Sequence, residues 1–152
     1  MKPKTTEELR AAGLRVTRPR RAVLDWLDDN PHATAEQVHE GVRPMLGSVS
    51  RQAIYDVLSA CASAHLIRQI RPAGHPARFE RRAGDNHHHL VCRCCGDVFD
   101  AECHTGHAPC LHPTHDQGFH IDEAEIVFWG ICPSCQPLQA SATPDDDRAD
   151  VP

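Results

Sequence analysis

The sequence predicts an α+β chain with a helical N-terminal domain closed by a β-hairpin and a small, mainly β (α/β) C-terminal domain. Apolar residues recur at helical spacing up to about residue 62. Two short strand-like segments then flank a turn that contains Pro72, Gly74 and Pro76. Beyond residue 84, short apolar segments alternate with pairs of cysteines, and no long helical pattern continues.

Helix-capping residues predict four helices in the first domain. Glycines or prolines follow three of them, with Gly13 after the first helix and Pro44 and Gly47 closing the third. Gln37 completes a capping box for the third helix, and the fourth runs to Ala62. The expected N-terminal caps are Thr5 or Thr6, Thr17, Thr34, and Ser48 or Ser50.

The fourth helix has an apolar side and a polar side. Ile54, Val57, Leu58 and Cys61 share the side expected to face the core. Strands expected over 66–71 and 77–82 complete the hairpin. Helices followed by a basic hairpin are typical of a winged helix, and we assign this domain to residues 1–83.

The second domain is expected over residues 84–135, with the boundary near residues 83–85. Segments 88–92, 98–102 and 126–129 are predicted strands of a small sheet. Residues 103–118 are rich in His, Pro and Gly and are predicted to form a loop. Residues 136–152 are expected to be a disordered acidic tail.

Charge is divided unequally between the two domains. Residues 1–83 hold 14 Lys and Arg against 9 Asp and Glu, whereas residues 84–152 hold 2 against 12. The basic part suits a phosphate-bearing partner, and the acidic part suits cations. With no apolar run long enough for a membrane and no signal peptide, we expect a cytoplasmic protein without a membrane partner.

Eight cysteines and twelve histidines indicate metal or redox chemistry rather than a disulfide scaffold. Cys92 and Cys95 form one C-x-x-C pair, and Cys132 and Cys135 form another. Two such pairs can complete a tetrahedral structural Zn²⁺ site. A redox dithiol or separate buried cysteines are the alternatives, and Cys94 can compete with Cys95 as a ligand.

Three consecutive histidines precede the first cysteine pair. On a strand, His87 and His89 point to one face and His88 to the other. Glu80 and Asp100 lie on neighbouring predicted strands and can add carboxylates. Mixed nitrogen and oxygen ligands suit Fe²⁺, Mn²⁺, Co²⁺ or Zn²⁺. The alternative is a run of solvated histidines.

Over nearly its whole length the sequence resembles the ferric uptake regulator (Fur) superfamily. Its catalase-linked FurA/CatR branch is the most similar, which the segment APCL (108–111) supports along with parts of the other motifs. The remaining motifs are LRVTRPR (14–20), HATAE (32–36), VSRQAIYDVL (49–58), ARFE (77–80), DNHHHLVCRCCG (85–96) and DEAEIVFWGIC (122–132).

This resemblance implies a homodimer that binds a double-stranded DNA operator, with a dimerisation domain in its second half. It also implies a regulatory Fe²⁺ or Mn²⁺ site between the domains. By position, that site takes His32, Glu80, His87, His89 and Asp100. The resemblance likewise makes the four paired cysteines a zinc site.

Some family members bind an additional metal through the position of His88. Ala124 stands where a histidine is common, which argues against that site here.

DNA contacts are expected from the polar face of the fourth helix and from the segment before the second helix. Tyr55 and Arg51 are expected to reach base edges and thymine methyl groups. Arg15 is placed in a minor groove, and phosphate contacts are assigned to Arg18, Arg20 and Gln52. Each of these arginines has an ordinary solvated side chain as its alternative role.

The functional hypothesis is a metal-dependent repressor that senses peroxide and controls a catalase-peroxidase and its own gene. Family members with Asp at the position of Asp100 tend to sense peroxide, which favours this over iron sensing. Thiol oxidation at Cys61, Cys94, Cys103 or Cys110 is a second redox route. A zinc hydrolase and a metal-storage protein are alternatives from other classes. Neither fits well, because no HExxH motif is present and storage does not explain the polar helix face.

Overall fold

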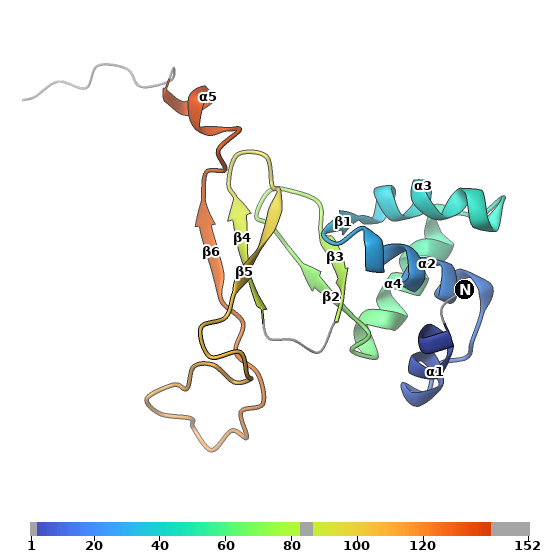
Figure 1. The fold of residues 1–152 in the computed structure, drawn as a ribbon, viewed down its shortest axis with the longest axis horizontal. Helices are drawn as coiled ribbons and strands as arrows, with labels where there is room; N and C mark the ends of the chain where they lie inside the picture. Colours follow the sequence, from blue (N-terminus) through green and yellow to red (C-terminus); the bar gives the residue numbers. More distant parts are fainter. Residues whose placement is uncertain (1–2, 83–86, 141–152) are drawn as a thin grey trace, which may run out of the picture.

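The first part of the chain is a helical unit with a three-stranded antiparallel sheet (Figure 1). The computed structural model describes residues 3–82 and 87–140. The sheet order is β1-β3-β2. The central strand β3 therefore pairs both with β2, its partner in the hairpin, and with β1, the short strand directly before α3. The elements are α1 (Pro3–Ala11), α2 (Arg18–Asp29), β1 (Ala33–Thr34), α3 (Ala35–Leu46), α4 (Arg51–Ser63), β2 (Ile67–Ile70) and β3 (Arg78–Arg81).

Three of the four predicted helix caps are confirmed. The Thr17 hydroxyl accepts a hydrogen bond from the Arg20 backbone N–H, Ser50 caps α4, and Thr34 forms the full capping box at α3. The expected cap of the first helix was wrong, because α1 already begins at Pro3. Thr5 is instead buried and donates a 2.5 Å hydrogen bond to Asp25 on α2.

Pro44 does not end the third helix as predicted. It lies inside α3, which continues to Leu46 and is capped by Gly47. At position 44 the missing N–H removes one hydrogen bond of the last turns, which the helix tolerates near its end.

The core of this unit lies between α2, α3, α4 and the sheet. The predicted apolar side of α4 is buried, as expected. Trp26 packs so closely on α3 that a Cβ added at Gly41 would lie 2.1 Å from its ring. Residue 41 therefore has to be glycine for α2 and α3 to approach this closely. Other members of this core are Leu24, Leu27, Val38, Val42 and Phe79.

The second part is a three-stranded sheet of order β5-β4-β6. Its strands are β4 (His87–Cys92), β5 (Val98–Glu102) and β6 (Val127–Gly130). Strand β4 pairs antiparallel with β5 and parallel with β6. A parallel neighbour requires a long connection. Residues 103–126 provide it without helix or strand, and in Figure 1 this loop leaves the sheet at the end opposite the C-terminal helix.

The C-terminal tail differs from the expectation at its start. Residues Gln136–Ala140 form a short helix, α5, where disorder was expected from residue 136. The rest of that predicted tail and the predicted domain boundary at 83–85 lie outside the described residues. Within the described ranges, none of the helices has the length and apolar character that a membrane crossing requires.

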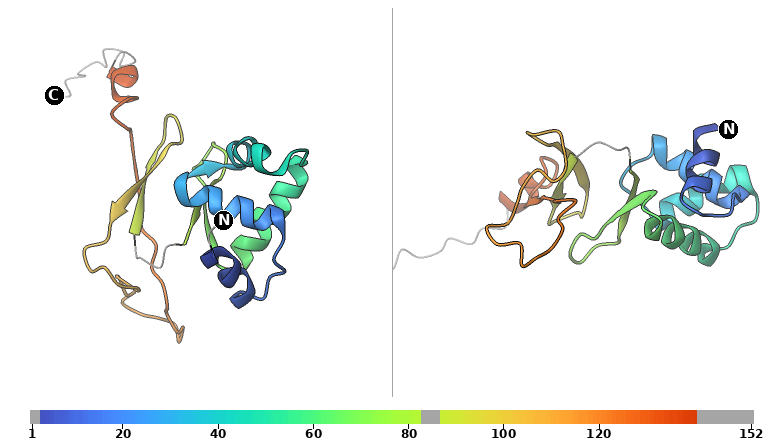
Figure 2. Two further views of the ribbon diagram at one scale, coloured as in Figure 1. Left: turned by 45° about the vertical axis from the view of Figure 1, so that its right-hand side comes forward. Right: turned by 90° about the horizontal axis from the view of Figure 1, so that it is seen from below.

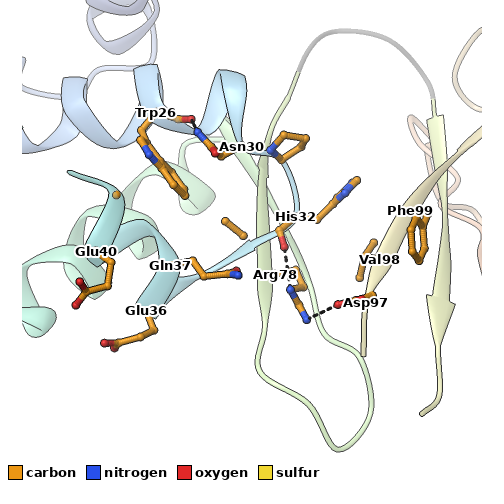
Figure 3. Close-up of a pocket in the computed structure, with 13 residues that line it drawn as sticks. Trp26, Asn30, His32, Glu36, Gln37, Glu40, Arg78, Asp97, Val98 and Phe99 are labelled. Atoms are coloured by element: carbon orange, nitrogen blue, oxygen red, sulfur yellow. Dashed lines mark hydrogen bonds and ion pairs between the residues drawn. The ribbon is translucent and has the colours of Figure 1, made fainter. Parts of the chain in front are cut away.

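The two sheets lie side by side, as both views in Figure 2 show. Apolar contact between them is small: Ile70 of β2 packs with Val91 and Val98 of the second sheet. Polar contacts supplement it: Arg78 of β3 donates to Asp97 of the second part and also holds the His32 carbonyl within the first part (Figure 3). A groove of about 710 Å³ separates the two parts beside these contacts. Side-chain interactions rather than a shared core therefore set their relative position.

Candidate metal centres and nucleic-acid interface

Five side chains from both parts of the chain converge between the two sheets. Pairing of β1 with β3 places Ala33 opposite Phe79, which brings His32 beside Glu80. Pairing of β4 with β5 places His89 directly opposite Asp100. His87 lies on the same face as His89 because side chains alternate along β4.

The carboxylate of Glu80 lies at the centre of this group. Its Oε1 is 3.1 Å from Nε2 of both His87 and His89, and its Oε2 is 2.9 Å from His32 Nε2. His32 Nε2 also lies 2.8 Å from Asp100 Oδ1. His32 thus bridges a carboxylate of the first part and a carboxylate of the second.

Burial and mutual attraction shift the titration of this group. Burial opposes ionisation of Glu80, but hydrogen bonds from His32 and His89 outweigh it and hold its pKa well below the usual range. Burial lowers the pKa of His32, but Glu80 and Asp100 outweigh that effect and raise it. The carboxylate of Glu80, held in its charged form, and that of Asp100 therefore make the site attractive to cations.

The group has the chemistry of a site for a divalent transition metal. Ligand atoms of His32, Glu80, His89 and Asp100 all lie within 4.8 Å of one another, and His87 lies beside Glu80. Imidazole nitrogens with carboxylate oxygens suit Fe²⁺, Mn²⁺ and Zn²⁺. His89 is fully buried, and its Nδ1 has no hydrogen-bond partner among the residues that the structure describes. Glu125 Oε1 is 3.6 Å from that nitrogen and can orient the ring.

His32 has an unusual backbone. Its φ of 60° lies in the left-handed region that residues other than glycine rarely adopt. Such strain costs about 1–3 kcal/mol and tends to occur at functional sites. The turn between α2 and β1 thereby aims the imidazole at the second sheet.

The four paired cysteines form a separate group in the second part. All four sulfurs lie within 4.8 Å of one another, with Cys95 and Cys132 sulfurs 3.8 Å apart. Sulfurs that bind zinc tetrahedrally at about 2.3 Å lie about 3.8 Å from each other. Cys94 is exposed and is not one of these four, but its side chain lies close enough to Cys135 to raise the pKa of that thiol. That Cys94 can compete with Cys95 as a zinc ligand stays a prediction.

Charge in the cysteine group also fits a cation. The Cys132 and Cys95 backbone N–H groups lower the pKa of Cys92 to about 6. Neighbouring sulfurs, Cys132 foremost, raise the pKa of Cys135. Four thiolates at this separation repel one another, and a Zn²⁺ ion would neutralise that repulsion.

A third group combines His88 with two loop cysteines that the sequence did not connect to it. His88 is buried on the other face of β4, with its Nε2 3.2 Å from Cys110 Sγ. The ligand atoms of His88, Cys103 and Cys110 lie within 4.8 Å of one another. Thr105 is the main group that lowers the pKa of Cys103, to about 6. The sequence feature that could have indicated this group is the pair of cysteines in the loop 103–126, which leads from β5 back to β6 beside β4.

The predicted DNA-contacting side chains lie on the helical unit, and most have intramolecular partners. Tyr55 is 53% exposed on α4. Arg51 forms a two-point pair with Glu36, both side chains being exposed. The remaining pairs are Arg18 with the Met45 carbonyl, Arg20 with the Arg15 carbonyl, and Gln52 with Asp56.

Comparison with known proteins now identifies the chain. The sequence pattern described as the ferric uptake regulator family matches residues 11–129. The chain belongs to the ferric uptake regulator family. Members of this family are metal-responsive transcriptional regulators and not enzymes, so the hydrolase alternative is dropped.

Two curated relatives and one solved structure illustrate the family likeness. Transcriptional regulator FurA of Mycobacterium tuberculosis is 53% identical over 133 residues, covering 88% of this chain and 90% of the relative. Ferric uptake regulation protein 1 of Mycolicibacterium fortuitum is 48% identical, covering 88% and 83%. The manganese-containing ferric uptake regulator structure from Pseudomonas aeruginosa is 27% identical with a TM-score of 0.67, covering 85% and 98%. The α+β fold with its winged helix and second domain is thereby confirmed.

Proposed function

We propose that this chain is a homodimeric repressor whose DNA binding is controlled by Fe²⁺ or Mn²⁺ between its two parts. The observation that carries the proposal is the convergence of His32 and Glu80 with His87, His89 and Asp100. An ion held by all five would connect the winged helix to the second sheet. It can favour one relative position only by binding that position more tightly. The Pseudomonas aeruginosa structure, which contains manganese, supports this choice of metal.

We assign Zn²⁺ to the four-cysteine group as a structural ion. Its sulfurs come from the last residue of β4 and the turn after it, and from the segment after β6. A zinc ion would thus tie together the ends of two parallel neighbours. This supports a role in folding of the second sheet that is separate from regulation.

We assign dimerisation to the second sheet, where large apolar side chains remain exposed. Leu90 and Phe99 are each 46% exposed, and Phe128 is 50% exposed. These three side chains line one apolar pocket on the sheet. An exposed apolar patch of this kind is characteristic of a protein interface.

We assign operator recognition to α4 of each subunit. Tyr55 is about half exposed on α4 and can contact a thymine methyl group. Arg51 would exchange its exposed Glu36 partner for DNA. Phosphate contacts fall to Arg18, Arg20 and Gln52 and a minor-groove contact to Arg15, as expected from the sequence.

Peroxide is the proposed signal, with control of a catalase-peroxidase gene and of the chain's own gene. An Fe²⁺ ion held by these five residues would supply the electrons that reduce peroxide to an oxidant beside them. His32 and His87 line the more accessible side of the site and are the residues expected to gain oxygen. An oxidised imidazole is a poorer ligand, so the two parts of the chain separate and DNA is released. Iron sensing is the alternative, and the relatives include proteins named for ferric uptake regulation.

A gel-shift assay tests the proposed function. The probe is DNA from upstream of the chain's own gene, and zinc-loaded protein is assayed with and without Mn²⁺. We expect Mn²⁺ to strengthen binding at least tenfold, or about 1.4 kcal/mol, within the usual range of allosteric coupling. Equal binding in both conditions would contradict metal control. Peroxide treatment of the Fe²⁺ form, followed by mass spectrometry, then distinguishes peroxide sensing from iron sensing. Peroxide sensing predicts added oxygen on a histidine ligand, whereas iron sensing alone does not require it.

A further inference from the structure

The group formed by His88, Cys103 and Cys110 is not used by the proposed function. His88 is 4% exposed on the face of β4 opposite His87 and His89. Cys103 directly follows β5, and Cys110 lies further along the loop that leads to β6. Both cysteines are half-buried, so they are reachable by a small molecule.

Hydrogen bonding decides which His88 nitrogen carries the proton. The Ile126 backbone N–H donates to His88 Nδ1 over 3.3 Å, so Nδ1 acts as the acceptor. In the neutral ring the proton then lies on Nε2, which donates toward Cys110 Sγ at 3.2 Å. A metal bound at Nε2 would need a free lone pair on that nitrogen. In this arrangement the His88 ring holds the Cys110 thiol by a hydrogen bond.

Both thiols have polar neighbours suited to reaction. The Thr105 hydroxyl lies 3.3 Å from Cys103 Sγ, and His88 holds Cys110. The two sulfurs are within 4.8 Å of each other, whereas a disulfide requires about 2.05 Å. The connecting residues contain no helix or strand. Rotation of the two side chains with a small loop adjustment can close this gap.

We propose that Cys103 and Cys110 are a dithiol that hydroperoxides oxidise reversibly to a disulfide, with His88 as a positioning residue. The pair is independent of the regulatory metal, because none of its atoms belongs to the five-residue site. It adds a second peroxide-sensitive site to the chain.

The reaction balances with hydrogen peroxide as the only oxidant. The Cys103 thiolate attacks one peroxide oxygen, the O–O bond breaks, and hydroxide departs as the leaving group. Cys103 is then a sulfenic acid. The Cys110 sulfur then attacks the Cys103 sulfur, the S–O bond breaks, and the oxygen leaves as water with the thiol proton. Two thiols are oxidised as one peroxide becomes two waters. A thiol reductant reverses the change.

The disulfide would act on the edge of the metal site. Asp100 lies on β5 three residues before Cys103, and the same loop carries Glu123 and Glu125 toward β6. The covalent bond would restrict how the end of β5 moves relative to this loop.

The test uses the full-length, zinc-loaded protein with Mn²⁺ in place of Fe²⁺, so that metal-driven histidine oxidation does not occur. Hydrogen peroxide is added, and peptides are mapped by mass spectrometry without reduction. We expect a Cys103–Cys110 disulfide, retained zinc, no oxygen on histidine, and full reversal by dithiothreitol. Failure of this result leaves the metal-dependent histidine oxidation to be judged separately in the Fe²⁺ form.

Variants make the assignment specific. Cys103→Ser and Cys110→Ser should each abolish the disulfide, whereas Cys94→Ser, at an exposed cysteine that does not belong to the His88 group, should leave it unchanged. His88→Gln should slow its formation several-fold with zinc retained. Absence of the disulfide in the native protein would overturn the proposal. So would a second tightly bound zinc per chain that Cys110→Ser removes, since that result would make the group a metal site.

Discussion

At the scale of single residues, the candidate regulatory metal group depends on local backbone geometry as much as on residue type. His32 reaches Glu80 and Asp100 from a left-handed backbone conformation in a short turn. Glu80 attracts three imidazoles because it is buried and ionised. Glu125, which the sequence did not suggest, lies behind His89. Each residue contributes by the position that its strand or turn imposes.

Tyr55 provides the residue-scale prediction for DNA reading. Tyr55→Ala should weaken specific operator binding by about 1–3 kcal/mol, the value of one good base contact. Non-specific binding, which depends on phosphate contacts, should change little. Fluorescence anisotropy with operator and scrambled DNA measures both. Tyr55→Phe, which keeps the ring, should retain most specificity, and equal loss on both DNAs would refute base reading.

Gly41 provides a residue-scale prediction for folding. A Cβ at this position would lie 2.1 Å from the Trp26 ring, so Gly41→Ala forces α2 and α3 apart. The expected loss in free energy of unfolding is about 1–3 kcal/mol, as for other overpacked cores. Urea denaturation measures it. Gly130→Ala is the control, since a Cβ there meets nothing within 4 Å; the same loss in both variants would contradict the packing argument.

At the scale of elements, local signals predicted most of the fold. Capping residues at Thr17, Thr34 and Ser50 located three helix starts, because their hydrogen bonds are local. Alternation along β4 predicted which histidines share a face. The tertiary pairings were not predictable in this way. Strand β1 has two residues, and the parallel placement of β6 depends on a partner 38 residues away in sequence.

The same distinction applies to the candidate sites. The two C-x-x-C motifs could be recognised from the sequence, because the two ligands of each pair are close together in the chain. His32 carried no such signal and came only from family resemblance, because the turn before β1 meets β5 only after folding. The same reason applies to Cys103 and Cys110, which meet His88 through the loop.

Glu123 provides the element-scale prediction. It precedes β6 and pairs with Arg68 on β2 at 2.7 Å and with Arg82 at 2.9 Å, which links the two parts of the chain. These arginines, Arg82 first, lower the pKa of Glu123. The stabilisation of the folded state by these ion pairs is thus fully present above the pKa of an unfolded carboxyl group, about 4.3. It is lost as the pH falls through the lower pKa that Glu123 has in the folded protein.

Glu123→Gln should therefore lower the thermal midpoint at pH 7 by a small amount, since the pair is partly exposed. The difference from the native protein should disappear in strong acid. Differential scanning fluorimetry at both pH values checks this. A difference that grows as the pH falls would contradict the ion-pair account.

At the scale of the whole molecule, the two candidate metal groups are proposed to have different tasks. The cysteine group lies within the second part alone, whereas the five-residue group spans both parts. The apolar contact between the parts is limited to a few side chains around Ile70. Their relative position is therefore open to control by a bound ion.

Zinc removal tests the first of these tasks. Chelation under reducing conditions should unfold or monomerise the second part while the helical core remains folded, because only the second part is held by the cysteine group. Circular dichroism with analytical ultracentrifugation measures both effects. A metal-stripped protein that keeps its dimer and melting point would show that zinc has no structural role.

The central claim, that the regulatory metal acts by joining the two parts, is tested most directly by removing its ligand from the winged-helix side. Operator affinity is measured against Mn²⁺ concentration for native protein, His32→Ala and the exposed-loop control His120→Ala, all zinc-loaded. The account predicts that Mn²⁺ strengthens binding at least tenfold, about 1.4 kcal/mol, in the native protein and the control, and little in His32→Ala. Undiminished Mn²⁺ activation of His32→Ala would contradict it.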